Sequence, residues 1–115
     1  SSPIMTDQAL KVAAALKEQG ISLKVINTPW LNKIDADWYA DQLSGVTAVA
    51  TLENHYSEMG MGCFVLSALS NASILQGKKS LIIGLDELPA CGQQGEVLAY
   101  HKLDSESIAA RLKEL

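Results

Sequence analysis

Positive charge is scarce in this 115-residue sequence, in which nine lysines and arginines face 13 aspartates and glutamates for a net charge of −4. Binding to nucleic acid needs a clustered basic patch that neutralises phosphates, so this balance argues against a nucleic-acid partner. No apolar run approaches the roughly 20 residues that cross a bilayer, which argues against a membrane partner. Neither His55 nor His101 stands in a metal-ligand spacing such as His-Glu-x-x-His, so we infer no protein-bound zinc.

Cysteine is also rare. The two cysteines, Cys63 and Cys91, make neither a disulfide framework nor a metal-ligand set, and they favour a reducing cytoplasm. Hydrophobic residues make up 48% of the chain, as in globular proteins. The length leaves room for one domain, residues 1–115, with one modest core.

The stretch Glu53–Gly62 is the most informative part of the chain. It follows Val46–Leu52, an apolar run that we interpret as a buried strand, and it precedes Cys63–Leu69, which we interpret as a helix with little polar surface. A strand, a polar turn with glycines and a buried helix form the unit of parallel α/β sheets. The carboxyl end of such a strand is where these proteins usually build sites.

The rest of the chain continues this alternation. Thr6 is the expected N-cap of a first helix with an apolar stripe that includes Leu10, and Gly20 is its expected end. The other expected elements are a strand at Ile21–Ile26, a short helix opened by Asp35 with Trp38 and Leu43 inward, a strand at Ser80–Leu85, a helical run at Glu96–Tyr100, and a helix at Ser105–Leu115 capped by Asp104.

This order predicts a three-layer α/β/α fold with a mostly parallel sheet of three strands and helices on both faces. The chain begins on a helix where a doubly wound domain normally supplies a strand. We therefore expect a fold that lacks its first strands, as in a fragment of a longer chain or subunit.

Several of these features together resemble one known family. They are Ala9-Leu10 in the first helix, Gly20-Ile21 before the predicted strand, Asp35 at the second helix, Thr51–Tyr56 running into Gly60 and Gly62, and then Gly92, Glu96-Val-Leu and Leu103-Asp104. In this order they resemble the C-terminal domain of transketolase and related thiamine-diphosphate enzymes. Met59 departs from the family pattern, which has a glycine at that position, and its side chain narrows any space for an anion.

The resemblance implies a strand just upstream of the first helix, between the segments Leu23–Asn27 and Ala48–Glu53. It also implies that thiamine diphosphate and Mg²⁺ are held by two upstream domains, on the same chain or on another subunit. The Gly-Asp-Gly and Asn motif that binds the metal in this family is absent here, so we assign no catalytic, cofactor or metal residue to this chain.

By resemblance, the function is that of a non-catalytic C-terminal domain that supports domain packing and dimer assembly. The parent enzyme would be a cytoplasmic homodimer or heterotetramer of the pentose phosphate pathway that transfers two-carbon ketol units between sugar phosphates. A related synthase with the same plan remains an alternative.

The residues also allow two other hypotheses about function. Glu53 and His55 could be an acid–base pair, although a mutually hydrogen-bonded pair at an interface, beside Tyr56, is the simpler expectation. Gly60 and Gly62 could cradle a phosphate or nucleotide with free helix amides, which would make the chain a stand-alone binding module.

A further hypothesis is that the chain is a pure interaction module, which presents Trp30 and the loop Asp86–Gly95 to a partner. His101, at the end of an apolar run, is expected to contact the carbonyls of the last helical turn.

Overall fold

A pair of parallel strands forms the centre of the fold in the computed structural model, which describes residues 2–31 and 33–115. Strand β1 (Ala48–Tyr56) and strand β2 (Lys79–Leu85) are joined by helix α3 (Met61–Asn71). Leu52 pairs with Ile83, and the register shifts between Leu52 and Tyr56. Parallel neighbours require such a helical crossover, so the predicted strand–turn–helix–strand unit is confirmed.

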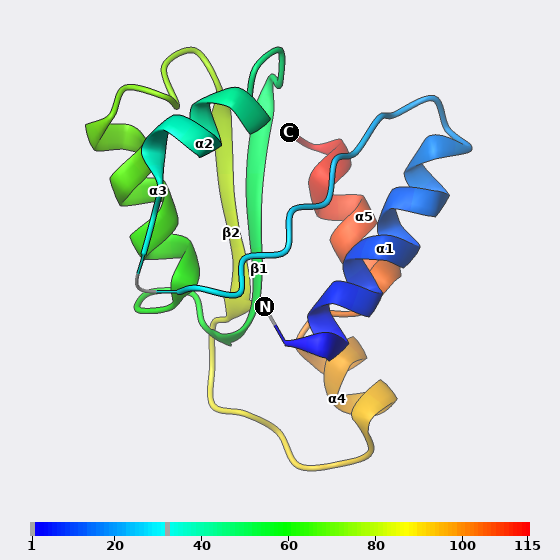
Figure 1. Ribbon diagram of the computed structural model, residues 1–115. Coiled ribbons are helices and arrows are strands. Elements are labelled where there is room, and N and C mark those ends of the chain that lie inside the picture. The colour runs from blue at the N-terminus through cyan, green and yellow to red at the C-terminus, as the bar shows by residue number, and fades with distance from the viewer. Residues whose placement is uncertain (1, 32) are drawn as a thin grey trace.

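Helices cover both faces of this sheet (Figure 1). Helices α1 (Pro3–Lys17) and α5 (Ser105–Lys113) lie together on one side, and α3 with α2 (Ala36–Gln42) lies on the other. Helix α4 (Gln94–Tyr100) lies near the start of α1, below α5 in this view. The predicted three-layer α/β/α class is therefore confirmed.

Each face of the sheet has its own small core. One consists of residues from α1, β2 and the C-terminal region: Met5, Val12, Leu16, Ile83, Leu103, Ile108 and Ala109. The other joins α2 to α3 and contains Tyr39, Leu43, Val65 and Leu69. Burial of these apolar side chains is the main favourable term that holds the helices on the sheet.

Two helices, α2 and α5, start at their predicted capping residues. The carboxylate of Asp35 accepts the amide of Trp38, and that of Asp104 accepts the amides of Glu106 and Ser107. The predicted N-cap of the first helix, Thr6, is wrong, because the helix begins at Pro3 with Ser2 as its N-cap. Proline is well suited to the first helical position, since its missing N–H would have no partner there.

Two predicted inward-facing residues point to solvent instead. Leu10 is 57% exposed, because the buried stripe of α1 runs through Met5, Gln8, Val12 and Leu16. Trp38 is 46% exposed, while Tyr39 and Leu43 are buried. In each helix the buried residues are spaced three or four apart, and the misplaced residue lies off that face.

The predicted strand at Ile21–Ile26 is wrong, since these residues form no ladder and the sheet has two strands in the part of the chain described. Their β-branched content is typical of a strand, but a strand also needs a partner about 4.8 Å away. Strand β1 is longer than predicted and continues through Glu53 to Tyr56, which we expected to be a turn. No helix in the described residues is long and apolar enough to cross a membrane.

Candidate functional site

The carboxyl end of β1 meets the start of α3 through a buried carboxylate. Glu53 is 6% exposed, and its two carboxylate oxygens accept the backbone amides of Met61 at 2.6 Å and Gly62 at 2.9 Å. These amides open α3 and have no partner within their own helix. A negative charge is also favoured at a helix N-terminus by the peptide dipoles. Glu53 therefore fastens the strand to the helix that follows it.

The two glycines of this turn are explained by how closely the carboxylate approaches. A Cβ atom at Gly60 would overlap the carboxylate of Glu53. At Gly62 it would overlap the hydroxyl oxygen of Thr51 and lie 2.9 Å from Glu53 Oε1. Glycine is the residue that lets the backbone approach a neighbouring group this closely. The glycines thus serve the contact with Glu53.

This geometry weakens the interpretation of the turn as an anion site. The amides of Met61 and Gly62, which a phosphate would need, are already bonded to the chain's own carboxylate. A second anion would have to displace Glu53 or lie beside it, and like charges at such distances repel.

The expected pairing of Glu53 with His55 is wrong. His55 is exposed, its Nδ1 lies 3.5 Å from the carbonyl oxygen of Tyr56, and its ring meets that of Tyr56 edge to face at a centroid distance of 5.9 Å. Tyr56 is 40% exposed. Both oxygens of Glu53 are committed to α3, so the two side chains form no acid–base pair.

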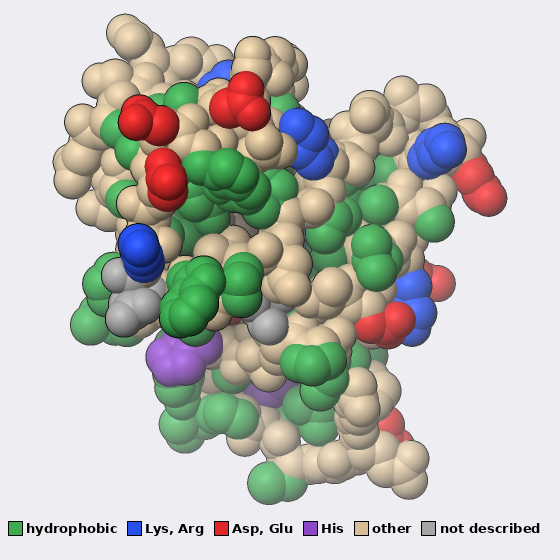
Figure 2. Space-filling view, viewed as in Figure 1, with side chains coloured by type: hydrophobic (Ala, Val, Ile, Leu, Met, Phe, Trp, Pro, Cys, Tyr) green, Lys and Arg blue, Asp and Glu red, His purple; other side chains and the backbone are tan. Residues whose placement is uncertain are grey.

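An apolar surface lies beside this turn, and we define it as Trp30, Leu31, Met59 and Phe64. These side chains are exposed by 70%, 50%, 77% and 65%, respectively. Three of them, with His55 and Pro29, line a hollow of about 580 Å³, and Trp30 lines an adjoining hollow of about 460 Å³ that shares Pro29. Figure 2 shows several groups of apolar side chains reaching the surface on one face of the molecule. Large exposed apolar side chains that gather in this way are typical of interaction sites.

A groove of about 200 Å³ runs along the free edge of β1. On one side are residues 48–52 of β1, and on the other is the extended segment Ser22–Ile26. Side chains of α1, including Val12, line it from one face of the sheet, and Val65 of α3 lines it from the other. The groove therefore separates the predicted strand at Ile21–Ile26 from the strand it would otherwise approach.

One residue of β1 marks the groove as incompletely covered. Ala50 is exposed although it lies in the middle of the strand. The buried hydroxyl oxygen of Thr51, which has no hydrogen-bond partner among the described residues, lies instead against Gly62 at the start of α3. The exposed strand position and the apolar lining are properties of a surface that another segment covers.

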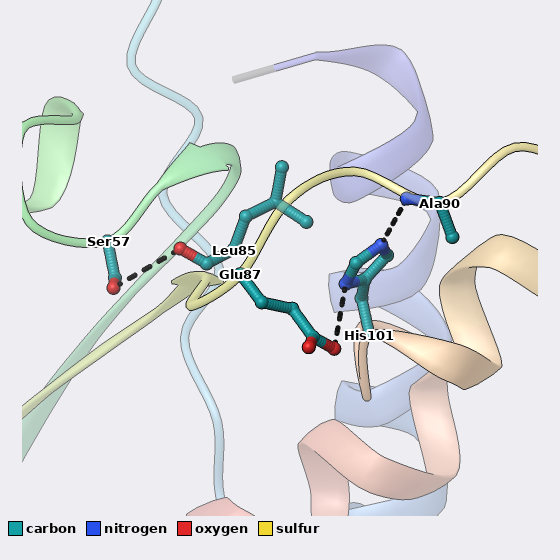
Figure 3. A network of polar contacts seen from close by, with 5 residues as sticks. All are labelled: Ser57, Leu85, Glu87, Ala90 and His101. Atoms are coloured by element: carbon teal, nitrogen blue, oxygen red, sulfur yellow. Dashed lines mark hydrogen bonds and ion pairs between the residues drawn. The ribbon is translucent and has the colours of Figure 1, made fainter.

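A second polar network, which the sequence did not reveal, holds the loop between β2 and α4 (Figure 3). The ring of His101 is buried and its Nε2 accepts the backbone amide of Ala90 at 2.9 Å, while Ser57 Oγ lies 3.4 Å from the carbonyl oxygen of Leu85. The expected contact of this imidazole with helix carbonyls is therefore replaced by a contact with the loop. Nothing in the local sequence indicated that partner, because Ala90 offers only its backbone.

Metal-binding residues do not converge in the part of the chain described, where no three His, Cys, Asp or Glu side chains are arranged to hold a cation. The donor set of the described residues thus does not fit Mg²⁺ with thiamine diphosphate.

The chain matches the family model described as "Transketolase, C-terminal domain" over residues 2–108. The chain belongs to this family. It is 32% identical over 108 residues to the "Putative transketolase C-terminal section" of Methanocaldococcus jannaschii, a match covering 93% of this chain and 33% of that protein.

Other relatives extend the comparison. A 1-deoxy-D-xylulose-5-phosphate synthase of Magnetococcus marinus is 34% identical over 110 residues, which cover 93% of this chain and 17% of that enzyme. A solved structure described as "Split gene transketolase, inactive beta4 tetramer" superposes with a TM-score of 0.81 at 25% identity and covers 96% of this chain and 35% of that one. This transketolase C-terminal domain thus spans about a third or less of the length of these relatives.

Proposed function

We propose that this transketolase C-terminal domain is a non-catalytic assembly domain of a transketolase-like enzyme. The observation that carries the proposal is the groove beside β1, an uncovered sheet edge lined by apolar side chains on both faces. Unpaired strand edges are templates for a further strand. The occupant is the strand that the family places between residues 23–27 and β1, supplied by the remainder of the parent enzyme on the same chain or on another subunit.

The proposal extends to the assembly and its chemistry. The parent is a cytoplasmic homodimer or heterotetramer that moves two-carbon ketol units between sugar phosphates in the pentose phosphate pathway. Support for assembly comes from the solved relative described as a tetramer and from the exposed apolar surface at Trp30 and Phe64. The synthase relatives supply the alternative chemistry, which product analysis of the assembled enzyme distinguishes.

A reconstitution experiment tests this function. The chain is mixed with a polypeptide that carries the upstream domains, and turnover of a ketose phosphate is followed with and without it. We expect no turnover from this chain alone and an active complex in which the amides of residues 48–52 gain protection from hydrogen exchange. Turnover by the purified chain, or a micromolar dissociation constant for thiamine diphosphate (about −8 kcal/mol), would contradict the proposal.

A matched pair of variants localises the contact. Ala50→Lys places a charged side chain in the groove, whereas Ala15→Lys changes an exposed position of α1. We expect the first to abolish the complex and the second to leave it intact, with both chains folded. Equal binding by the two variants would mean that the groove is not where the partner sits.

The second candidate, an interaction module without an enzymatic parent, is favoured by the 70% exposure of Trp30. It predicts partner binding that depends on Trp30 and on the loop Asp86–Gly95 but gives no ketol transfer in any combination of subunits.

A further inference from the structure

His101 is a buried histidine at the C-terminal end of α4. Its side chain is 2% exposed, and its backbone amide donates to the carbonyl of Val97 at 3.0 Å. The ring therefore projects from the end of the helix into the interior, under the loop formed by residues 86–93. Protonation of a buried ring changes both its charge and its hydrogen bonding.

The contacts of the ring fix its protonation state. Nε2 accepts the amide of Ala90 at 2.9 Å, so Nε2 carries no hydrogen, and the hydrogen of the neutral ring lies on Nδ1. Nδ1 in turn lies 3.9 Å from Oε1 of Glu87, a carboxylate that is 61% exposed. The two nitrogens thus face two residues of the same loop (Figure 3).

The loop has a second attachment at its start. The hydroxyl of Ser57 donates to Asp86 Oδ1 at 2.6 Å, next to the last residue of β2. Between the two attachments Leu88 is 82% exposed and makes no core contact. At its far end the loop is held by the capping box of α4, in which the amide of Gln93 donates to Glu96 Oε2 at 3.2 Å. Between these two ends, the hydrogen bond from Ala90 ties the loop to His101.

We propose that His101 is a pH-sensitive latch for the loop of residues 86–93. A protonated imidazole carries hydrogen on both nitrogens, so Nε2 stops accepting and becomes a donor that faces the donor of Ala90. Ala90 then leaves the ring, while the new positive charge is drawn to Glu87 through Nδ1. Acidification therefore releases the Ala90 side of the loop, keeps the Glu87 side near the ring and leaves the sheet folded.

Ionisable groups on α4, α5 and α1 have contacts of their own in the described structure. Tyr100 of α4 touches it edge to face at a centroid distance of 4.9 Å. The Asp104 carboxylate, before α5, binds the amides of Glu106 and Ser107, and on α1 Asp7 pairs with Lys11. Glu87 is the charged group that responds to the ring.

Hydrogen exchange at Ala90, read by NMR on the ¹⁵N-labelled chain, tests the latch. Between about pH 8 and 5, where imidazoles titrate, we expect protection of this amide to fall about tenfold or more as the His101 ring protonates, in keeping with the loss of one hydrogen bond. The amide of Ile83 in the core should keep its protection, and long-range ¹⁵N spectra should report hydrogen on Nδ1 at high pH.

Three variants separate the latch from a structural role. His101→Gln keeps an acceptor that does not titrate, so Ala90 should stay protected at every pH. His101→Phe keeps the ring without an acceptor, so Ala90 should be unprotected at every pH. His55→Gln removes the chain's other histidine, which is exposed, and should leave the transition unchanged.

The latch is overturned if Ala90 keeps its protection while His101 protonates, if His101 stays neutral down to pH 5, or if the transition disappears in His55→Gln. Should His101→Phe not fold, the comparison of the unmodified chain with His101→Gln still decides.

Discussion

Glu53 Oε1 accepts a 2.9 Å hydrogen bond from the amide of Gly62, nine residues further along the chain. The bond links the end of β1 to the first turn of α3, and both partners are buried. It gives the glycine turn a structural role, since the turn allows the carboxylate to reach the helix amides.

Replacing Glu53 by Gln should lower the free energy of unfolding by about 1–3 kcal/mol, the usual effect of leaving a buried hydrogen-bonding group unsatisfied. The variant keeps the volume of the side chain but turns one acceptor into a donor that faces a helix amide. Urea unfolding followed by circular dichroism measures the change. The control, Glu58→Gln, alters an exposed carboxylate in the same turn and should change stability by less than about 0.5 kcal/mol.

Gly60→Ala should also destabilise the chain, by about 1–3 kcal/mol, because its Cβ overlaps the Glu53 carboxylate. In a Glu53→Ala background the overlap is gone, so the same substitution should cost much less. A double-mutant cycle on unfolding free energies measures this coupling. Additive effects would argue against the overlap. Gly95→Ala, where a Cβ meets nothing within 4 Å, provides the control.

Asp104 should make stability depend on pH at the acidic end. Burial raises the pKa of this carboxyl, but the hydrogen bonds from Ser107 and Glu106 lower it by more, so it lies below its ordinary value of 3.8. A group whose pKa is lower in the folded state favours folding above its unfolded pKa, and this contribution disappears as the pH falls through the folded pKa.

Asp104→Ala should therefore cost about 0.5–2 kcal/mol at neutral pH, as expected for an N-cap, and progressively less as the pH falls below about 4. Thermal unfolding of both chains at pH 7 and at successively lower pH measures the difference. A gap that stays constant with pH would show that the carboxylate charge is not involved. Glu114→Ala, an exposed carboxylate at the other end of α5, should leave the pH profile unchanged.

The apolar surface should contribute to association and not to folding. Phe64→Ser removes a side chain that is 65% exposed, so unfolding free energy should change by less than about 0.5 kcal/mol. Association with the partner or with a second copy should weaken about tenfold or more if Phe64 is an aromatic anchor. Analytical ultracentrifugation measures this, and Leu88→Ser, at an 82% exposed position elsewhere, is the matched control. Equal effects of the two would mean that Phe64 has no special role.

Local signals in the sequence were enough for most of the elements. Asp35 and Asp104 cap helices as predicted, Gly20 lies with φ of +80° in the turn that follows α1, and β2 follows its apolar run. These features depend on a few neighbouring residues, so the sequence carries them directly. The strand at Ile21–Ile26 failed because its regularity depends on a partner strand that is not adjacent in the sequence.

The candidate site was predicted in position but not in its contacts. Glu53, Gly60 and Gly62 do lie together, whereas the expected partner, His55, faces solvent. The carboxylate instead binds backbone amides, which every residue has, so no residue type in the sequence indicated them. The same reason hides the contact of His101 with Ala90.

The uncovered edge of β1 has a consequence for how the protein must be handled. The backbone N–H and C=O groups of an unpaired strand edge can form hydrogen bonds with a strand of another chain. Apolar side chains on both sides of the edge favour such pairing. Concentrated solutions of the isolated chain should therefore aggregate edge to edge. Production together with the proposed partner should reduce this aggregation, because the proposed strand would cover the edge.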